Sequence, residues 1–248
     1  DYTELGSADF LQRLKNCSAK QVVLFIHGYS NLPEPDVFPR AMALQKMFNK
    51  KKPNLVEVVS IVWPCDNDLG IVKDYWDDQK AADASGFSFA RVLERFETWR
   101  NNNSNIDIPC LKRINVLAHS MGNRVLRETI RLWGKYDRQD RIPMLFRNTF
   151  LVAADIVNEN LSRGESGELI CDASRNVIVY FASDDLALRA SKITNLKNSV
   201  ASRRLGHTGP EDMSKVPSNV YAVDCDDYNT DYDSPKGHSY FLDGKRKG

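Results

Sequence analysis

Ser120 stands at a point of the sequence where a serine hydroxyl could act as a nucleophile. The apolar run at 114–118 predicts a strand, a helix pattern begins at Gly122, and the residues across the junction read Ala-His-Ser-Met-Gly. This is the setting of a nucleophile elbow, whose usual form is Gly-x-Ser-x-Gly because so tight a turn needs small residues two positions either side of the serine. Ala118 is only one methyl larger than the usual glycine. The alternative is a strand-to-helix turn without chemistry, since short motifs also match by chance.

Two backbone N–H groups are expected to face the Ser120 hydroxyl and to stabilise an oxyanion. The elbow aims the amide of Met121 at the reacting centre, where the positive end of the following helix adds to its effect. The strand predicted at 21–26 ends in a sharp turn, and the amide of Tyr29 in that turn is the expected second donor. His27, in the same turn, is predicted to be a packed core histidine.

The base that would activate Ser120 is expected near the far end of the sequence. In hydrolases with an elbow of this kind the triad runs serine, acid, histidine along the chain, with the histidine after the last strand. The last predicted strand is 219–223; His238 follows it and His207 precedes it. His238 is therefore the predicted base.

Three aspartates are candidates for the acid that orients His238. Asp184 and Asp185 follow one predicted strand, and Asp155 follows the strand before it. The acid must accept the second imidazole N–H and stabilise the imidazolium that forms. Asp185 is the first choice and Asp184 the second, although adjacent aspartates also commonly cap a helix.

Strand-length apolar runs alternate with amphipathic helix patterns along the whole chain. This alternation predicts an α/β fold with a mostly parallel central sheet and helices on both faces. The predicted strands are 21–26, 55–63, 114–118, 149–154, 177–182 and 219–223. One helix pattern has an apolar face formed by Phe89, Val92, Leu93, Phe96 and Trp99. No linker divides the sequence, so residues 1–248 are predicted to form one domain, and the segment at 162–168 is expected to form at most a small lid.

Composition excludes several classes of function. The chain has 248 residues, of which 42% are hydrophobic and 27% charged, with a net charge of +1. The sequence has no basic stripe of the kind that binds nucleic acid. None of its apolar runs approaches the roughly 18 residues of a membrane span. The five cysteines are widely spaced and are predicted to be free thiols, which favours a cytoplasmic protein, although a start at Asp1 leaves room for a removed leader. The oligomeric state is not predicted.

No metal or cofactor motif is found in the sequence. The acidic segment 224–233 invites comparison with a calcium loop, but the sixth and twelfth positions hold Asn229 and Pro235 instead of glycine and glutamate. We therefore interpret the segment as an acidic, solvated loop that carries His238, and we expect neither a metal nor a cofactor.

The combination of several short segments is more specific than any one of them. They are FIHGYS (25–30), WPCDN (63–67), DYWDDQKAADAS (74–85), LAHSMGN (117–123), LVAADI (151–156), FASDDLALRAS (181–191) and RLG (204–206). From about Val22 to His238 the chain resembles the α/β-hydrolase superfamily. More narrowly, it resembles an uncharacterised, mainly bacterial family of α/β-hydrolase-like proteins catalogued as a domain of unknown function.

The resemblance implies roles for further residues. The family pattern Ser-x-Asp-x-Ala-Leu matches the segment from Ser183 to Leu188 and favours Asp185 over Asp184. It also implies that three residues line or brace the cleft, namely Trp63, Tyr75 and Asp155. The alternative for these three is two core aromatics and a buried, hydrogen-bonded carboxylate.

These residues predict a serine hydrolase that cleaves a small-molecule carboxylic ester or thioester through an acyl-enzyme. Ser120 would be the nucleophile, His238 the base and Asp185 the acid. One alternative is an acyltransferase that uses the same triad and passes the acyl group to an alcohol or amine. The other is a binding module without catalysis, because a hydrolase fold alone does not guarantee chemistry.

Overall fold

Six parallel strands form one sheet at the centre of the protein. A computed structural model describes residues 3–65, 71–102, 112–137, 141–189 and 203–242. The strands lie in the order β2-β1-β3-β4-β5-β6, and every neighbouring pair is parallel. Their bounds are β1 Gln21–Ile26, β2 Val56–Ile61, β3 Arg113–His119, β4 Phe146–Val152, β5 Ser174–Phe181 and β6 Val220–Asp224. All six predicted strands are present.

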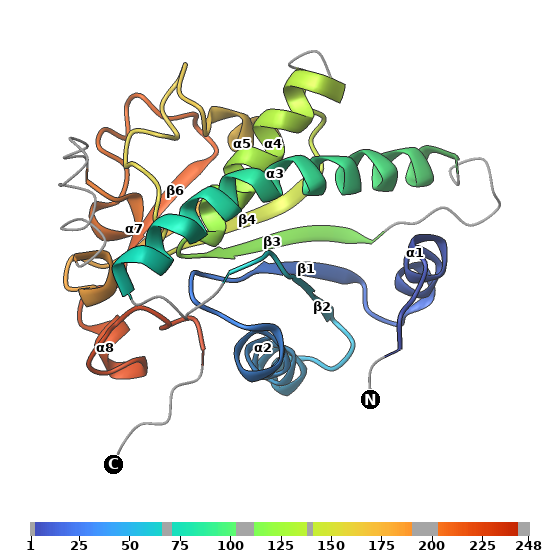
Figure 1. The fold of residues 1–248 in the computed structure, drawn as a ribbon, viewed down its shortest axis with the longest axis horizontal. Coiled ribbons are helices and arrows are strands. Elements are labelled where there is room, and N and C mark those ends of the chain that lie inside the picture. The colour runs from blue at the N-terminus through green and yellow to red at the C-terminus, as the bar shows by residue number, and fades with distance from the viewer. Residues whose placement is uncertain (1–2, 66–70, 103–111, 138–140, 190–202, 243–248) are drawn as a thin grey trace.

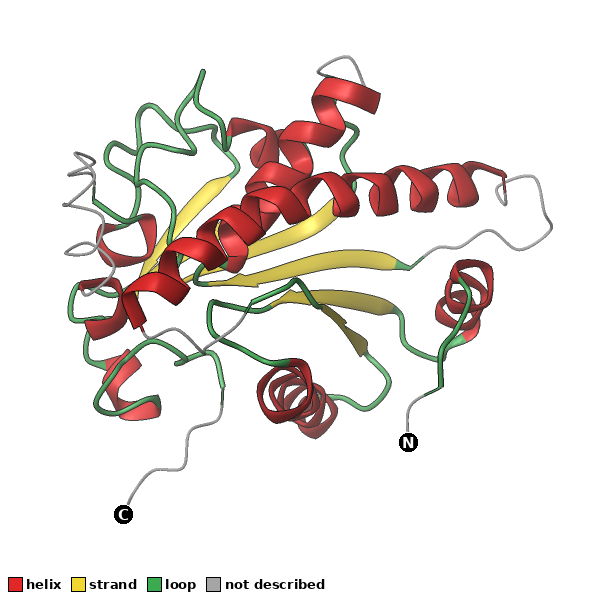
Figure 2. Cartoon of the chain, viewed as in Figure 1, coloured by secondary structure: helices red, strands yellow, loops and turns green. Residues whose placement is uncertain are grey.

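Helices cover both faces of this sheet, as the predicted fold class requires. The helices are α1 Ser7–Asn16, η1 Pro33–Val37, α2 Phe38–Lys51, α3 Ile71–Asn102, α4 Gly122–Asp137, α5 Glu168–Asp172, α7 Leu205–Thr208 and α8 Tyr228–Tyr232. α3 and α4 pack together on one face, whereas α2 lies on the other (Figure 1). Figure 2 shows the same layers, with the sheet between the helices. Between β4 and β5 the chain forms turns and the five-residue α5, which is a small excursion.

The apolar character of β1 follows from its position between the two helical layers. The side chain of Ile26 belongs to the core beneath α3 and α4. That of Phe25, next to it, belongs to the opposite core with Leu44 of α2. Successive side chains of a strand point to opposite faces, so a strand covered on both faces needs apolar residues at nearly every position.

β4 and β5 begin three residues earlier than the sequence predicted. The prediction missed these starts because polar residues stand near the beginning of each strand. Asn115, Asn148 and Asn176 are neighbours on β3, β4 and β5. The amide of Asn148 donates to Asn115 at 2.9 Å, and that of Asn176 donates to Asn148 at 2.9 Å. The three side chains satisfy one another across the sheet, which hydrophobic periodicity alone does not reveal.

The carboxyl ends of parallel strands meet at one edge of a sheet, and the backbone is most strained there. Of the five non-glycine residues with positive φ in the described parts of the chain, Ser30 has φ 54°, Ser120 φ 52° and Ala153 φ 47°. These three left-handed residues follow β1, β3 and β4. Strain of this kind tends to gather at functional sites, so this edge is where a site is to be sought.

Within the described residues, none of the helices combines the length and the apolar character that crossing a bilayer would demand.

Candidate active site

Ser120 is held in its strained conformation by hydrogen bonds on both sides of the residue. Its N–H donates to the carbonyl of Val152 at 3.0 Å. Its carbonyl accepts from the amide N–H of Asn123 at 3.1 Å, from the side chain of Asn123 at 2.9 Å, and from the N–H of Asp155 at 3.2 Å. These bonds tie the elbow to the ends of β4 and α4 and fix the direction of the serine.

Small residues let other backbone segments pass close to the elbow. A Cβ at Gly122 would lie 2.5 Å from the carbonyl oxygen of His27. A Cβ at Gly28 would lie 3.0 Å from both the Cβ of Ser120 and Nδ1 of His119. The glycines therefore bring the loop after β1 directly beside Ser120, where a second oxyanion donor would be needed.

The amides of Met121 and Tyr29 are free to bind a ligand oxygen as far as the described residues extend. No group among those residues accepts a hydrogen bond from either amide. The loop that carries Tyr29 is fixed by its neighbours: the N–H of Ser30 donates to Asp78 at 2.9 Å, and the side chain of Asn31 donates to the carbonyl of Gly28 at 3.1 Å. Fixed donors of this kind need no reorganisation when negative charge develops on a substrate.

His238 and Asp185 form a close pair although 53 positions separate them in the sequence. Nδ1 of His238 lies 2.7 Å from Oδ2 of Asp185. The carboxylate of Asp185 is fully buried, and its other oxygen accepts the N–H of Leu188 at 3.0 Å. Nδ1 must carry a proton to donate to a carboxylate, so in the neutral form of this ring Nε2 is the atom with the lone pair that can accept a proton.

The backbone around His238 is positioned by Asp233 and His119. The carboxylate of Asp233 accepts the N–H groups of His238 at 2.9 Å and of Ser239 at 2.7 Å. Nε2 of His119 donates to the carbonyl of His238 at 3.0 Å, and the two rings lie 4.8 Å apart between centroids. The residue that precedes the serine in sequence therefore holds the loop that carries the histidine.

The structure places the imidazole of His238 beside the elbow without a direct bond to the serine. None of the hydrogen bonds among the described residues joins Ser120 to His238. Ser120 is 6% exposed, and the side chain of His238 is 15% exposed. Catalytic hydrogen bonds are often long in a free enzyme and shorten when the substrate is bound.

The other two candidate acids have different partners. Asp184 accepts a hydrogen bond from the side chain of Asn229 at 2.6 Å. Asp155 is buried, accepts the hydroxyl proton of Tyr75 at 2.6 Å, and lies 3.1 Å from Nε of Arg204. That last contact is an ion pair without the alignment of a hydrogen bond. Of the three aspartates, only Asp185 contacts His238 through its side chain in the described residues.

The aromatic residues implied by the resemblance are buried and pack against residues of the loop after β1. Trp63 is 1% exposed and stacks on His27, with its indole N–H donating to the His27 carbonyl at 2.9 Å. Tyr75 is 6% exposed and meets the ring of Tyr29 edge-on at 5.7 Å. Both are core aromatics that support the β1 loop.

His27 is a core histidine, as the sequence suggested. Its Nε2 accepts the N–H of Trp63 at 3.1 Å, and its Nδ1 donates to the carbonyl of Gly28 at 2.8 Å. Burial lowers its pKa to about 4, so the ring is neutral at neutral pH. Burial likewise lowers the pKa of His119 well below its usual range. His207, the remaining histidine, lies on α7 ahead of β6.

The sequence did not predict the hydrogen bonds that the acidic segment 224–233 accepts, because we expected this segment to be solvated. Asp226 accepts the N–H of Ser183 at 2.5 Å and its hydroxyl at 2.6 Å, beside the acid loop. Asp233 orients the histidine loop, as described above. The only signal in the sequence was that these carboxylates stand near His238 along the chain.

The four described cysteines are free thiols, and burial keeps two of them protonated. Cys17, Cys65, Cys171 and Cys225 are free thiols, and Cys110 lies outside the described residues. Burial raises the pKa of Cys171 to about 12 and that of Cys225 to about 11, so both are protonated at neutral pH. Across the parts of the chain that the structure describes, no group of three or more His, Cys, Asp or Glu side chains is arranged to hold a metal.

A family model described as alpha/beta hydrolase of unknown function (DUF900) matches residues 4–245. No curated protein and no solved structure matches the chain. The match includes the elbow, the acid loop and the histidine loop.

Proposed function

Because the chain belongs to an alpha/beta hydrolase family of unknown function (DUF900), we propose that it is a serine hydrolase that cleaves a small carboxylic ester or thioester. The observation that carries the proposal is the 2.7 Å contact between His238 and the buried Asp185, beside a serine held at φ 52°. A buried carboxylate, an imidazole bonded to it and a serine hydroxyl at a nucleophile elbow are the parts of a Ser-His-Asp triad.

The reaction would proceed in two steps. The Ser120 oxygen attacks the carbonyl carbon while its proton passes to Nε2 of His238, and the amides of Met121 and Tyr29 bind the oxyanion. The carbon–oxygen or carbon–sulfur bond then breaks, and His238 returns the proton to the leaving alcohol or thiol. Water attacks the acyl-enzyme with the same proton relay and releases the acid. No cofactor is needed.

Asp185 would act throughout these steps without changing its own protonation. It fixes the tautomer with hydrogen on Nδ1 and stabilises the imidazolium that forms. Its complete burial removes competing water from the pair, which strengthens the interaction at the moment charge develops.

Replacement of the nucleophile tests the proposal. Ser120→Ala should lower kcat for a short p-nitrophenyl ester by roughly 10⁴- to 10⁶-fold, as removal of a triad nucleophile does. A fluorophosphonate probe should label the native chain and fail to label this variant. Ser214→Ala, which changes an exposed serine bonded to Asp212, is the matched control and should behave as the native protein.

Each alternative gives a different result. Native-like turnover or labelling in Ser120→Ala would refute the triad. Absence of labelling and turnover in the native chain would indicate a binding module instead of an enzyme. Transfer of the acyl group to an added alcohol or amine in preference to water would indicate an acyltransferase.

A further inference from the structure

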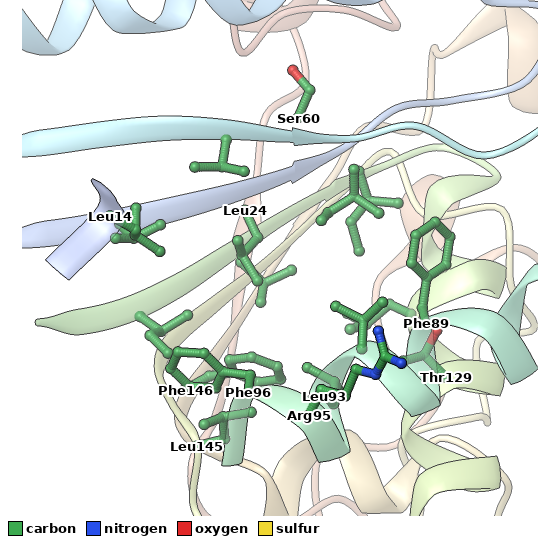
Figure 3. Close-up of a pocket in the computed structure, with 18 of the residues that line it drawn as sticks. Leu14, Leu24, Ser60, Phe89, Leu93, Arg95, Phe96, Thr129, Leu145 and Phe146 are labelled. Atoms are coloured by element: carbon green, nitrogen blue, oxygen red, sulfur yellow. The ribbon is translucent and has the colours of Figure 1, made fainter. Parts of the chain in front are cut away.

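A largely apolar cavity of about 330 Å³ lies between the sheet and α3, away from the candidate active site. The sheet contributes Val22, Leu24 and Ile26 of β1, and α3 contributes Phe89, Val92 and Phe96. Figure 3 shows the labelled side chains of Leu24 and of the two phenylalanines around this hollow. α1 closes it near the amino ends of the strands through residues such as Leu14.

The walls of this cavity are apolar but incompletely packed. α3 presents the apolar face that the sequence predicted, yet Val92 is 53% exposed and Phe89, Leu93 and Phe96 are only partly buried. None of the residues of α1 is buried. Protein interiors normally leave few voids larger than a water molecule, so a hollow of this size is not ordinary core.

The size and polarity of the cavity suit an apolar ligand. Ligand sites usually have volumes of about 300–1,000 Å³, and a dry apolar cavity takes up apolar molecules in preference to water. Val22 and Ile26 are four residues apart on β1, which corresponds to roughly 13 Å along the strand. An extended alkyl chain advances about 1.2 Å per bond, so a chain of roughly twelve carbons has the same length as this wall of the cavity.

Arg95 supplies a charge at the rim of the cavity. Of the described lining residues it is the only charged one, and it is exposed. No carboxylate in the described parts of the chain forms an ion pair with it. Figure 3 places its guanidinium on the α3 side of the hollow. A cation at the mouth of an apolar cavity complements a molecule with one anionic head and one apolar tail.

We propose that this cavity is an accessory binding site for a fatty acid of about twelve carbons, with its alkyl chain along β1 and its carboxylate at Arg95. The described lining includes neither Ser120, His238 and Asp185 nor the residues that brace them. The site is therefore separate from the proposed triad, and binding there does not require ester cleavage.

Isothermal titration calorimetry with dodecanoate, at concentrations below those at which it forms micelles, tests the proposal. We expect saturable binding to one site, with the same affinity in the native chain and in Ser120→Ala. Leu24→Trp should weaken binding by roughly tenfold or more, because the larger side chain occupies the volume that the alkyl chain would fill. Absence of saturable binding, or unchanged binding in Leu24→Trp, would overturn the proposal.

The charge at the rim is tested separately with dodecanol as a neutral probe. Arg95→Gln should weaken dodecanoate binding by roughly two- to fivefold, the range of an exposed ion pair, and leave dodecanol binding unchanged. Arg91→Gln, one turn earlier on α3 and outside the described lining, is the matched control. Equal weakening for both probes, or the same effect in the control, would count against a carboxylate at Arg95.

Val92→Glu keeps the proposal testable if Leu24→Trp does not fold. Because Val92 is exposed, the substitution should preserve the fold while its charge repels dodecanoate more than dodecanol. Light scattering tests the remaining alternative, which is that a second copy of the chain covers this face. A native dimer that does not bind dodecanoate and that Val92→Glu converts to monomers would identify this face as an interface between two copies and overturn the proposal.

Discussion

Asp155 and Asp185 are two buried carboxylates at the same edge of the sheet, and they differ only in their partners. Asp155 follows β4, is 2% exposed, and faces the Arg204 guanidinium and the Tyr75 hydroxyl. Asp185 follows β5, is fully buried, and faces the imidazole of His238. An arginine stays charged at every relevant pH, whereas a histidine gains and loses a proton near neutrality. One pair can therefore only hold the structure together, and the other can also move a proton.

Asp185→Asn tests the catalytic role that we propose for the pair of Asp185 and His238. The amide would keep the volume but would donate toward Nδ1 and favour the wrong tautomer, so we expect kcat to fall by roughly 10⁴-fold on a p-nitrophenyl ester. Steady-state kinetics on protein with a native circular dichroism spectrum is the measurement. A loss smaller than tenfold would mean that Asp185 is not the acid.

Asp155→Asn should instead act mainly on stability. It leaves a buried guanidinium without its counterion, so the free energy of unfolding should fall by about 3–5 kcal/mol, measured by urea denaturation. Adding Arg204→Met removes the unpaired cation and should restore part of the loss. If Asp155→Asn is as stable as the native chain and as inactive as Asp185→Asn, the roles of the two aspartates are reversed.

The same contrast between structural and chemical partners separates His27 from His238. The pKa of His27 is lowered to about 4 in the folded state, so on acidification the unfolded state takes up its proton first. The contribution of His27 to the free energy of unfolding is therefore fully present above pH 6.5. As the pH falls toward 4, the free energy of unfolding decreases by on the order of 3 kcal/mol. Urea unfolding from pH 7 to pH 4 should show a shallower decline in His27→Gln than in the native chain. Parallel curves would show that His27 is not the residue responsible.

His119 lies between these two kinds of histidine, because it is buried as His27 is, yet it donates a hydrogen bond to the carbonyl of His238. His119→Leu removes that bond and leaves His238 less well positioned. The activation free energy should rise by about 1 kcal/mol, so kcat should fall by roughly five- to tenfold. His119→Gln keeps a donor and should recover most of the activity. Equal kcat in both variants would remove the positioning role of His119.

The sequence was sufficient for the architecture because the relevant signals are local. Continuous apolar runs such as 21–26 mark strands covered on both faces, and the small residues around Ser120 mark a tight turn. Chain order then singled out His238 over His207. The starts of β4 and β5 were missed because Asn148 and Asn176 look like loop residues until their neighbours across the sheet are known.

The sequence ranked Asp185 first among the candidate acids, but the partners that the fold brings to each carboxylate could not be read from local pattern. Asp184 and Asp185 are adjacent, yet one faces Asn229 and the other His238. The positioning roles of His119 and Asp233 likewise come from segments distant in sequence. The periodicity of α3 predicted an apolar face correctly, but how completely that face is covered is a property of the assembled layers.

The left-handed residues Ser30, Ser120 and Ala153 have a consequence for how such a protein would drift over evolutionary time. Each holds a conformation that costs a non-glycine residue about 1–2 kcal/mol and that glycine adopts freely. Under the proposed mechanism, selection for turnover opposes glycine at position 120, because glycine has no hydroxyl to attack the substrate. A lineage released from that selection would gain by relaxing the bend, so glycine in place of this serine in a descendant would record the loss of its reaction.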